Sequence, residues 1–510
     1  MKMLIFILLT IQVIKGEVCP NGSLKERMAP YGVLKSEIGT PIDDHLNSLT
    51  AGPRGPILMQ DSRYLEEMAH FDRERIPDRV VHGKGNGAFG YFIVTDDVTH
   101  YTKAKLFNRI GKRTPIAVRF STTNGEVGSP DSLRTLRGMA IKFYTEEGNW
   151  DLVGNNIPVF PIRDPMLFPS LIKVTTVNSV SNLRSLTESF WDFVSLRPEN
   201  LGTVVFLFSD RGIPQSYRHM HGFGINTFKL VNATGTPVYC RFSYLTDQGI
   251  RNLTAEEAQE LAGMDPDAHG RDLFQAIEQK NFPSWTFYIQ VMTTEEARRV
   301  SFNPFDSTRE WPEDAFPFIR VGKLVLNRNP TDHFSQVEQL ALCPANLVPG
   351  IEASPDKILQ GRLFSYRDSQ RYRLGANHNQ LPVNYPFRSP PNNYQRNGFM
   401  TVTRSQAFPS YYPNSYKKPV QDPFAKDSPF EACGIAARHD SSEEDNYSQP
   451  RMFYNRLDSS QRDRLLQNML GSLRRTSTCI QGRVVEHFKI IDSEFGERIE
   501  EALENSRMEM

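Results

Sequence analysis

Short runs of alternating apolar and polar residues dominate the chain from about residue 78 to residue 328. Successive side chains of a β-strand point to opposite faces, so this period of two predicts a series of half-buried strands. Their number favours an antiparallel sheet closed into a barrel, with helical inserts between some of the strands. The clearest runs are 91–95, 116–120, 140–144, 204–208, 238–242 and 286–291.

Helical patterns replace this alternation in three places. Residues 356–369 are expected to form a helix, and Thr254 followed by Glu257 is the start signal of a helical insert in the barrel. From about residue 447 onward, apolar residues recur every three or four positions, and Asp458 is placed to cap one of these helices. An apolar face packed on the main body explains this last pattern better than a ligand site does.

Two segments lack a clear period. Residues 17–77 are polar and would make a poor domain alone, so we expect an amino-terminal arm that lies against something else. Residues 329–446 are rich in Pro, Asn and Tyr, and are too aromatic for a free linker. We interpret them as an extended segment that wraps over the barrel or over a neighbouring subunit. The predicted regions are therefore 1–16, 17–77, 78–328, 329–446 and 447–510, the first being a leader and the last carboxyl-terminal helices.

The first sixteen residues have the pattern of a secretory signal peptide. Lys2 precedes an apolar stretch from Leu4 to Ile14, and Gly16 is a small residue suited to cleavage before Glu17. The stretch is too short to span a bilayer as a stable helix, and a disordered apolar tail is the alternative. We therefore expect a secreted, extracellular protein with no membrane contact after the signal is removed.

Other features fit the secretory route. The last residues, 506–510, do not form a peroxisomal address. Five Cys residues are too few for a disulfide scaffold, and their odd number leaves at least one thiol free or joined to another chain, with Cys19 the best candidate. Four Asn-x-Ser/Thr triplets, each weak evidence alone, begin at Asn21, Asn232, Asn252 and Asn446.

Composition narrows the range of partners. The 59 basic and 59 acidic side chains give a formal net charge of zero, which gives no support for a nucleic-acid or anionic-membrane partner. The 33 Phe and 18 Tyr residues would suit a large flat apolar ligand, although ordinary core packing explains most of them. The length of 510 residues allows a large core and more than one structural region.

Two short segments far apart in the chain carry the most specific chemistry. Arg362 lies four residues before Tyr366, so on a helix the two side chains meet on one face. A neighbouring cation favours an ionised phenol, which when free has a pKa of about 10. From spacing alone, a buried Tyr beside a surface Arg is the simpler explanation. His82 follows two valines, and such a His is by itself more often a core or surface residue.

These two segments, with a third between them, resemble the haem catalases. They read FDRERIPDRVVHGKG at 71–85, DLVGNN at 151–156 and RLFSYRD at 362–368, and the resemblance runs from about residue 39 to about residue 414. Tyr is an unusual axial ligand of haem iron and points to catalase. The resemblance implies an α+β fold. Its parts are an antiparallel eight-stranded β-barrel core, an amino-terminal arm, an extended wrapping segment and a carboxyl-terminal helical region.

The same resemblance implies an activity and a cofactor. Two molecules of hydrogen peroxide would give dioxygen and two of water, through a ferryl porphyrin-radical intermediate of haem b, iron protoporphyrin IX. It makes His82 the acid–base that carries the peroxide proton, Asn155 the group that orients peroxide, and Tyr366 the iron ligand. Ser121 is expected to hold His82 by a hydrogen bond, and Val81 to narrow the approach to it. Asn156 is interpreted as a turn-forming neighbour.

Further residues match positions around the haem of the family. Phe160 and Phe168 match apolar residues near its face. Arg79, Arg119 and Arg373 match the residues that pair with the haem propionates, a charge-assisted and often bidentate contact. Arg362 matches the residue that supports the iron-bound phenolate.

The chain departs from the family pattern at two positions near this site. Asn226 stands in a Gly-x-Gly-x-Asn-Thr sequence where the family usually has a titratable His, so the electrostatic support behind Arg362 should differ. Thr135 replaces an acidic residue that animal members usually have in the main access channel. Loss of its field can lower peroxide turnover.

A third departure concerns the surface site where many family members bind NADPH. Phe206, Ser209, Arg211 and Trp311 match that site, whereas Gly202, Leu245 and Glu313 stand where the usual pattern has His, Lys and His. Losing cations that face phosphates, and adding a carboxylate, predicts weak or absent NADPH binding.

Two other functions are open at this point. A catalase-related haem enzyme acting on organic or lipid hydroperoxides would typically carry Thr before the distal His, where this chain has Val81. A haem-binding or structural secreted protein with a decayed site is disfavoured because His82, Asn155 and Tyr366 are all present. Catalases are usually tetramers with interlocked arms, and the polar arm and aromatic wrapping segment fit a homotetramer.

Overall fold

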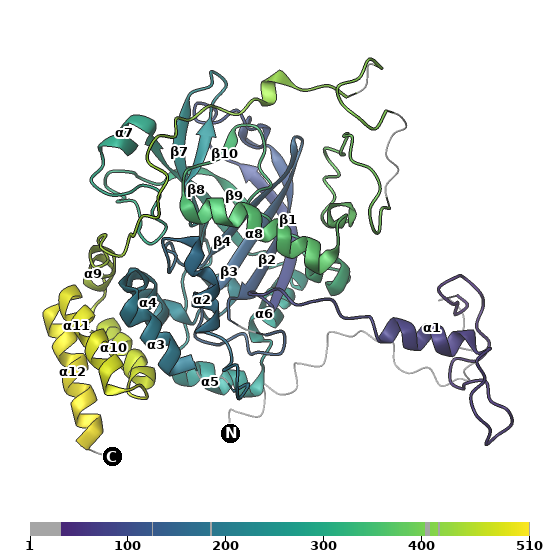
Figure 1. The fold of residues 1–510 in the computed structure, drawn as a ribbon, viewed down its shortest axis with the longest axis horizontal. Helices are drawn as coiled ribbons and strands as arrows, with labels where there is room; N and C mark the ends of the chain where they lie inside the picture. The colour runs from purple at the N-terminus through teal and green to yellow at the C-terminus, as the bar shows by residue number, and fades with distance from the viewer. Residues whose placement is uncertain (1–31, 125, 184–185, 403–408, 417–418, 509–510) are drawn as a thin grey trace. The chain divides into compact units, whose positions relative to one another are not determined.

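The computed structural model describes residues 32–124, 126–183, 186–402, 409–416 and 419–508 (Figure 1). The predicted leader, Cys19 and the triplet at Asn21 lie outside the described residues. The chain divides into two compact units, Met1–Pro77 and Asp78–Met510, which we describe separately. No helix in the described ranges is long and apolar enough to cross a bilayer.

The first unit contains the helix α1 (Ser62–Phe71), which the sequence pattern did not single out. Asp61 caps it, because its side chain accepts a hydrogen bond from the Tyr64 amide at 3.2 Å. No residue of α1 is buried, and Leu65, Met68 and Phe71 are exposed. The helix is therefore amphipathic, with apolar side chains that the first unit itself does not cover.

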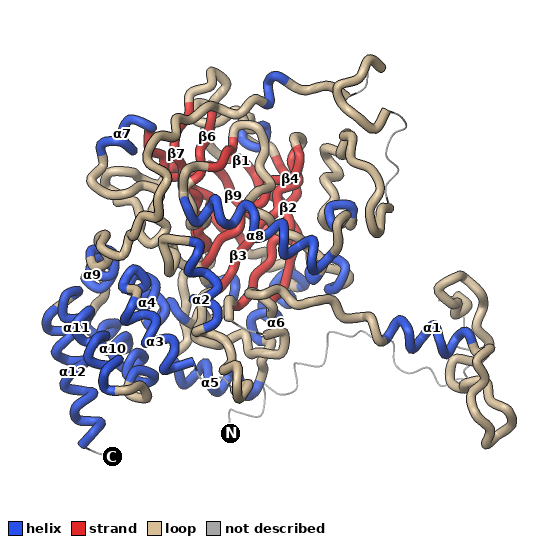
Figure 2. Tube along the Cα trace, viewed as in Figure 1, coloured by secondary structure: helices blue, strands red, loops and turns tan. Residues whose placement is uncertain are grey.

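Eight strands of the second unit close into an antiparallel barrel, drawn in red in Figure 2. They follow one another in the order β7-β5-β4-β3-β2-β1-β9-β8, and β8 pairs again with β7. The eight-stranded antiparallel barrel expected from the resemblance is confirmed. The strands are β1 (Gly85–Val94), β2 (Arg113–Thr122), β3 (Arg137–Thr145), β4 (Gly148–Asn155), β5 (Gly222–Phe223), β7 (Pro237–Thr246), β8 (Ser284–Thr293) and β9 (Ile319–Arg328).

Two short strands extend the barrel at one place. β6 (Phe228–Val231) pairs with β7 next to β5, and β10 (Ile351–Ala353) pairs with β6. Since β10 leads directly into the helix α8 (Lys357–Leu374), this extension fixes where α8 begins. Figure 1 shows α8 running across the outside of the barrel strands.

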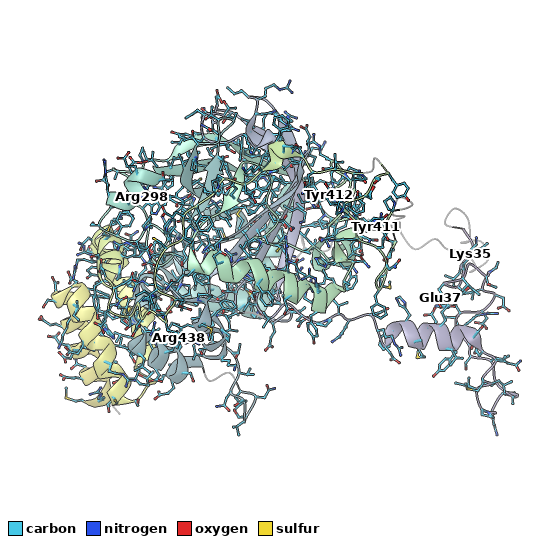
Figure 3. The ribbon with its side chains drawn as sticks, turned by 45° about the horizontal axis from the view of Figure 1, so that its top comes forward. Lys35, Glu37, Arg298, Tyr411, Tyr412 and Arg438 are labelled. Carbon is cyan, nitrogen blue, oxygen red and sulfur yellow. The ribbon has the colours of Figure 1, made fainter. Side chains whose placement is uncertain are left out.

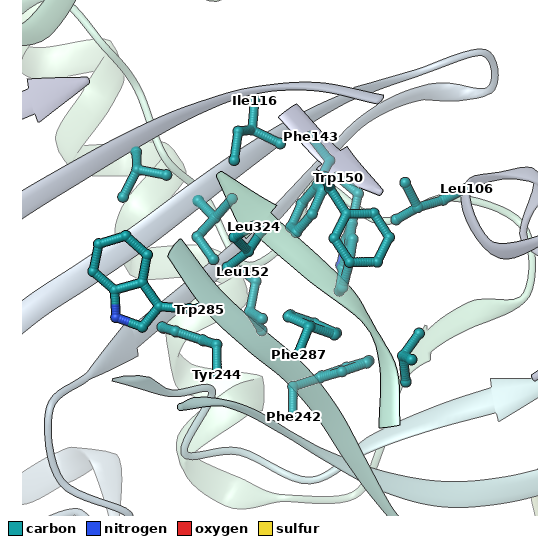
Figure 4. Packing of buried hydrophobic residues seen from close by; sticks show 14 of the residues in the cluster. Leu106, Ile116, Phe143, Trp150, Leu152, Phe242, Tyr244, Trp285, Phe287 and Leu324 are labelled. Carbon is teal, nitrogen blue, oxygen red and sulfur yellow. The ribbon is translucent and has the colours of Figure 1, made fainter. Parts of the chain in front are cut away.

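Aromatic side chains fill the inside of the barrel (Figure 4). Phe143 stacks on Trp150 with ring centroids 4.6 Å apart, and Phe287 contacts Phe92 and Phe242 at 5.5 and 5.8 Å. Such offset and edge-on contacts add to the free energy gained by burying the rings. The interior is a packed core, so a large ligand has to bind outside the barrel wall.

The apolar run 204–208 is not a strand, contrary to the prediction. It belongs to α4 (Leu201–Phe208), in which every residue but Leu207 is buried. Phe206 packs on Phe453 of the carboxyl-terminal helices, with ring centroids 4.0 Å apart. A short apolar run suits a buried strand or a helix covered on all sides, and periodicity cannot separate the two.

The other predicted helices are present. Thr254 and Glu257 form a capping box at the start of α5, and Asp458 does the same with Gln461 at the start of α10. The remaining helices of this unit pack outside the barrel, and α9 to α12 form one apolar cluster with α3 and α4. Their bounds are α2 (Phe168–Lys173), α3 (Leu186–Leu196), α5 (Ala255–Met264), α6 (Ala268–Glu278), α7 (Thr294–Arg299), α9 (Ser448–Asn455), α10 (Ser459–Leu473), α11 (Thr478–Ile491) and α12 (Ser493–Met508).

The described residues between 375 and 446 (375–402, 409–416 and 419–446) have little regular structure. They are tied to the barrel at Ser428, whose amide and hydroxyl donate to Glu352 at 3.0 and 2.8 Å. Glu352 also pairs with Lys229 at 2.8 Å, and both side chains are buried. Tyr411 and Tyr412 are about half exposed and project from this segment in Figure 3.

Candidate active site

Helix α8 carries three of the predicted site residues. Asp356 caps the helix, since its carboxylate accepts a hydrogen bond from the Leu359 amide at 3.0 Å. The helix continues to Leu374, past the predicted end at residue 369, so Arg373 lies on it together with Arg362 and Tyr366. Arg362 Nη2 donates to the Tyr366 Oη at 3.2 Å. A cation at this distance stabilises negative charge on the phenol oxygen.

A buried hydrogen-bond chain supports Arg362 from behind. Arg362 Nη1 donates to Asn226 Oδ1, and Asn226 Nδ2 donates to Asp356 Oδ2 at 3.0 Å. Burial raises the pKa of Asp356, although bonds from Leu359, Asn226 and Thr227 oppose the shift. Asn226 therefore joins an arginine to a carboxylate through one fixed acceptor and one fixed donor. Asn226 thus connects Arg362 to Asp356, although it cannot titrate like the His that the family usually has at this position.

His82 occupies the facing wall in an uncommon backbone conformation, with φ +64°. Its Nδ1 lies 2.9 Å from Ser121 Oγ, and its amide donates to the Thr123 carbonyl at 3.1 Å. Gly138 of β3 leaves room for this pair. A Cβ there would lie 2.5 Å from Ser121 Oγ and 2.7 Å from His82 Nδ1. The sequence did not mark Gly138 as a site residue, because its role depends on a neighbour 56 positions away.

The imidazole of His82 is neutral at ordinary pH. Burial is the main reason that the pKa of His82 falls from 6.5 to about 3, and the positive charges of Arg119, Arg362 and Arg79 lower it further. A neutral ring can accept a proton and return it, which a permanently protonated ring cannot.

Asn155 ends β4 and borders the same cavity as His82 and Tyr366. Its backbone pairs with Gly138, and no hydrogen-bond partner of its side-chain amide is found among the described residues. The next residue differs, because Asn156 Oδ1 accepts from the Arg137 amide at 2.8 Å. Asn155 thus keeps a donor and an acceptor for a ligand, whereas Asn156 holds the backbone.

The two walls enclose a cavity of about 520 Å³, within the range of small-molecule and cofactor sites. A second space of about 120 Å³ adjoins it, and both are bordered by Val81, His82, Phe168 and Tyr366. The structure brings all the sequence-predicted site residues together here. The larger space also touches Asn155, Phe160 and Arg362, and the smaller one Arg79, Arg119, Ser121 and Arg373.

Three arginines gather at the end of the smaller space around one carboxylate. Arg79 and Arg373 both donate to Glu338 Oε1, at 3.0 and 2.9 Å. Burial lowers the pKa of Arg119 to about 10, and its Nε is buried with no partner among the described residues. Three cations and one carboxylate leave an excess of two positive charges. Glu338 was not predicted from the sequence, because it lies 259 residues from Arg79.

These features fit a haem group. Its flat apolar ring suits a slot lined by Phe160 and Phe168, whose rings are nearly parallel at 6.4 Å. Its two carboxylates match the double excess of positive charge at the arginine end. The phenol of Tyr366, bonded to Arg362, would be the residue to hold the iron, and the imidazole of His82 lines the same spaces. The fold and the site together define a haem-binding oxidoreductase.

Comparisons with known proteins give the family. The family model described as Catalase matches residues 35–418, and the one described as Catalase-related immune-responsive matches residues 440–503. The catalase of Glandirana rugosa is 55% identical over 94% of this chain and 90% of its own length. The catalase of Drosophila melanogaster is 51% identical over 92% of this chain and 94% of its own.

Solved structures agree with this result. Catalase A from Saccharomyces cerevisiae superposes with a TM-score of 0.88 and 43% identity, over 92% of this chain and 99% of the other. A fungal catalase gives the same TM-score with 42% identity, over 92% and 96%. The chain therefore belongs to the catalase family. It is a haem catalase that decomposes hydrogen peroxide, and nothing found favours the alternative that acts on organic or lipid hydroperoxides.

No carboxylate is found among the described residues that line the larger space, although Asp78 and Glu126 border a neighbouring space that shares Val81, Thr123 and Asn124 with it. Thr135 lines the larger space, and its hydroxyl lies 2.8 Å from that of Thr123. Among the described residues that line this space, the titratable side chains are His82, Arg362 and Tyr366. The field along the approach is therefore not set by an acidic side chain at position 135.

A separate cavity of about 400 Å³ is lined by most of the residues that match or replace the NADPH-site residues of the family. Trp311 is buried and does not line this cavity, and Gly202 lies outside it too. Two further carboxylates, Asp210 and Glu310, border it together with Arg456. The residues of the comparison that line it are Phe206, Ser209, Arg211, Leu245 and Glu313. Three carboxylates thus face two guanidinium groups.

Proposed function

We propose that His82, Asn155 and Tyr366 carry the peroxide chemistry around haem b held in the cavity between α8 and the barrel. The observation that carries this proposal is the pair of facing contacts, Arg362 to Tyr366 on one wall and Ser121 to His82 on the other. When bound, the haem supplies the reversible oxidation that amino-acid side chains lack.

His82 acts as the proton carrier. Its neutral imidazole accepts a proton from one oxygen of hydrogen peroxide and returns it to the other. The hydroxyl of Ser121 keeps the ring in place, and the Asn155 amide orients peroxide with one donor and one acceptor. Val81 and the two phenylalanines Phe160 and Phe168 restrict the approach with apolar surface.

Tyr366 would hold the iron through its phenol oxygen. The guanidinium of Arg362 donates a hydrogen bond to that oxygen, and Asn226, itself bonded to Asp356, holds the guanidinium in place. Arg79, Arg119 and Arg373 line the smaller space and would pair with the carboxylates of the cofactor.

Substitution of Tyr366 and of His82 tests these roles. We expect Tyr366→Phe to lose the wild-type optical spectrum of the haem, and His82→Ala to retain haem but evolve oxygen about 100- to 10,000-fold more slowly. Tyr372→Phe is the matched control, because Tyr372 lies on the same helix and is exposed. A Tyr366→Phe protein with an unchanged spectrum and unchanged oxygen evolution would show that another group holds the iron.

The cavity on the far side of α4 binds NADPH weakly or not at all. A dinucleotide phosphate carries several negative charges, and Leu245 and Glu313 offer it no cation where the family pattern has Lys and His. Glu310 and Glu313 also repel it, whereas Asp210 is already paired with Arg464 at 2.7 Å. Isothermal titration of the purified protein is expected to give no micromolar affinity for NADPH. Reversing the charge with Glu313→Lys should then strengthen binding.

The protein is a homotetramer. Support comes from the apolar side chains of α1 that the first unit does not cover, and from exposed aromatic residues such as Phe399 and Phe424 in the wrapping segment. Light scattering of the purified protein is expected to give about four times the chain mass. Leu65→Glu and Met68→Glu together should shift that mass downward.

The protein is also secreted and carries a glycan. The amino-terminal pattern supports export, and Asn232 supports the modification because it is only part-buried and directly precedes the exposed residues 233–236. Asn446 is buried and accepts a hydrogen bond from Arg163, so it is a poor acceptor. Mass spectrometry of protein collected from the medium is expected to find the leader removed and a glycan at Asn232, and none at Asn446.

A further inference from the structure

His82 has a backbone conformation that its surroundings must maintain. A φ of +64° places a residue with a side chain in the left-handed region, which costs about 1–2 kcal/mol relative to ordinary conformations. Strain of this kind persists only where neighbouring groups over-determine the backbone. The bond from the His82 amide to the Thr123 carbonyl is one such restraint.

Arg119 provides a stronger restraint from the next strand. Its Nη1 donates to the His82 carbonyl at 2.8 Å, and its Nη2 donates to the Gly83 carbonyl at 3.0 Å. The side chain is buried, so both charge-assisted bonds are shielded from water. A flat guanidinium can hold two consecutive carbonyls at once, which a single ammonium group cannot do in the same geometry.

The surrounding residues leave space for this contact. At Gly85 an added Cβ would lie 2.8 Å from both Cζ and Nη2 of Arg119. Arg119 is also two residues before Ser121 on β2, so the same strand fixes the backbone of His82 and its ring. The remaining donor, Nε, has no partner among the described residues, and the side chain borders the smaller space of the cavity.

We propose that Arg119 is a positioning residue for His82. Besides offering charge to a haem carboxylate, it clamps the His82 and Gly83 carbonyls and thereby holds the strained backbone that presents the imidazole to peroxide. This inference rests on the proposed role of His82 as proton carrier. It couples the carboxylate end of the haem site to the geometry of the group that moves the proton.

Comparison of Arg119→Lys with Arg373→Lys in the haem-loaded enzyme tests the proposal. Both variants replace a guanidinium at the arginine end, but the bonds found from Arg373 to the described residues go to the Glu338 side chain and carbonyl. Hydrogen exchange of the peptide covering 79–85 reports the backbone directly, and optical absorbance reports the haem content.

We expect Arg119→Lys to exchange the His82 amide faster and to lower kcat by about 100-fold at equal haem content, as a displacement of about 1 Å can do. Arg373→Lys should leave that exchange rate unchanged and lower kcat far less. Equal exchange rates in the two variants, with an equal loss of kcat, would overturn the proposal.

Melting temperatures test the proposed contact of Arg119 with the His82 backbone even if Arg119→Lys takes up no haem. With Arg119 present, His82→Gly should melt at a higher temperature than His82→Ala, because only glycine adopts the left-handed region without strain. With Arg119→Lys the difference should vanish as the backbone relaxes, and a difference that persists would refute the clamp. Undiminished oxygen evolution by His82→Ala would instead refute the proton-carrier role while leaving the backbone result intact.

Discussion

Substitution of Gly138 by Ala separates catalytic geometry from haem binding. The new methyl group would lie 2.5 Å from Ser121 Oγ and 2.7 Å from His82 Nδ1, whereas ordinary contact begins at 3.4 Å. The Ser121 hydroxyl, the His82 ring or both must therefore move by about 0.7–0.9 Å. The methyl group would lie against both atoms of the His82–Ser121 hydrogen bond. Arg362 and Tyr366, on the other wall, are not among the three nearest atoms.

A displacement approaching 1 Å at a catalytic group lowers the rate by about 100-fold, which corresponds to about 2.7 kcal/mol in the activation barrier. We therefore expect Gly138→Ala to lower kcat/KM for hydrogen peroxide by about this factor. Haem content and the optical features that depend on Tyr366 should stay close to those of the wild type. Oxygen evolution at an electrode gives the rate, and absorbance gives the bound haem.

Gly471→Ala is the matched control, since a Cβ at this position of α10 meets nothing within 4 Å. It should leave activity unchanged and raise stability slightly, because alanine favours the helix. If Gly138→Ala retained the wild-type kcat/KM with full haem content, the reasoning that the His82–Ser121 pair needs this space would be wrong.

Three further predictions concern the titration of His82, a buried ion pair between β3 and β4, and the side chain at position 135. Because the pKa of His82 is lowered from 6.5 to about 3, oxygen evolution should stay level from pH 8 to pH 5 and fall only toward pH 3, so an inflection near 6.5 would contradict the shift. The unfolded chain binds more protons at His82 than the folded one between these values, so this group lowers stability as pH falls from about 6.5 to about 3. Lys142→Met leaves Asp151 buried without its cation at 2.8 Å and should cost about 3–5 kcal/mol in urea unfolding. Thr135→Asp should raise kcat/KM for peroxide, while the uncharged Thr135→Asn should not, in parallel oxygen-electrode assays.

The barrel was predictable because its strands alternate with a period of two that is visible in the sequence. The strand predicted at 204–208 is a helix because this segment is buried on nearly every side. Such a segment lacks the polar positions that distinguish a helix from a strand. Helix α1 was not predicted because residues 17–77 are mostly polar and show no clear period. Such elements take their conformation from packing or capping that local pattern does not record.

The site was predictable to different degrees on its two walls. Helical spacing predicts that Arg362 and Tyr366 meet, but their place in the site, like that of His82, required the family resemblance; Arg373 joins them because the helix continues. His82 required the family resemblance, since nothing in its local sequence marks it. Glu338 and Gly138 act through partners brought together by the barrel, so no local signal could have found them.

A single helix, α8, carries Tyr366, which we propose as the iron ligand, together with Arg362, which contacts it, and Arg373 at the arginine end of the cavity. Seven residues separate Tyr366 from Arg373, which is about two turns or roughly 10 Å along the axis. A single inserted residue between them would turn one relative to the other by about 100° and break the match to both ends of the porphyrin simultaneously. This stretch of chain should therefore accept exchanges of side chains far more readily than any change in its length.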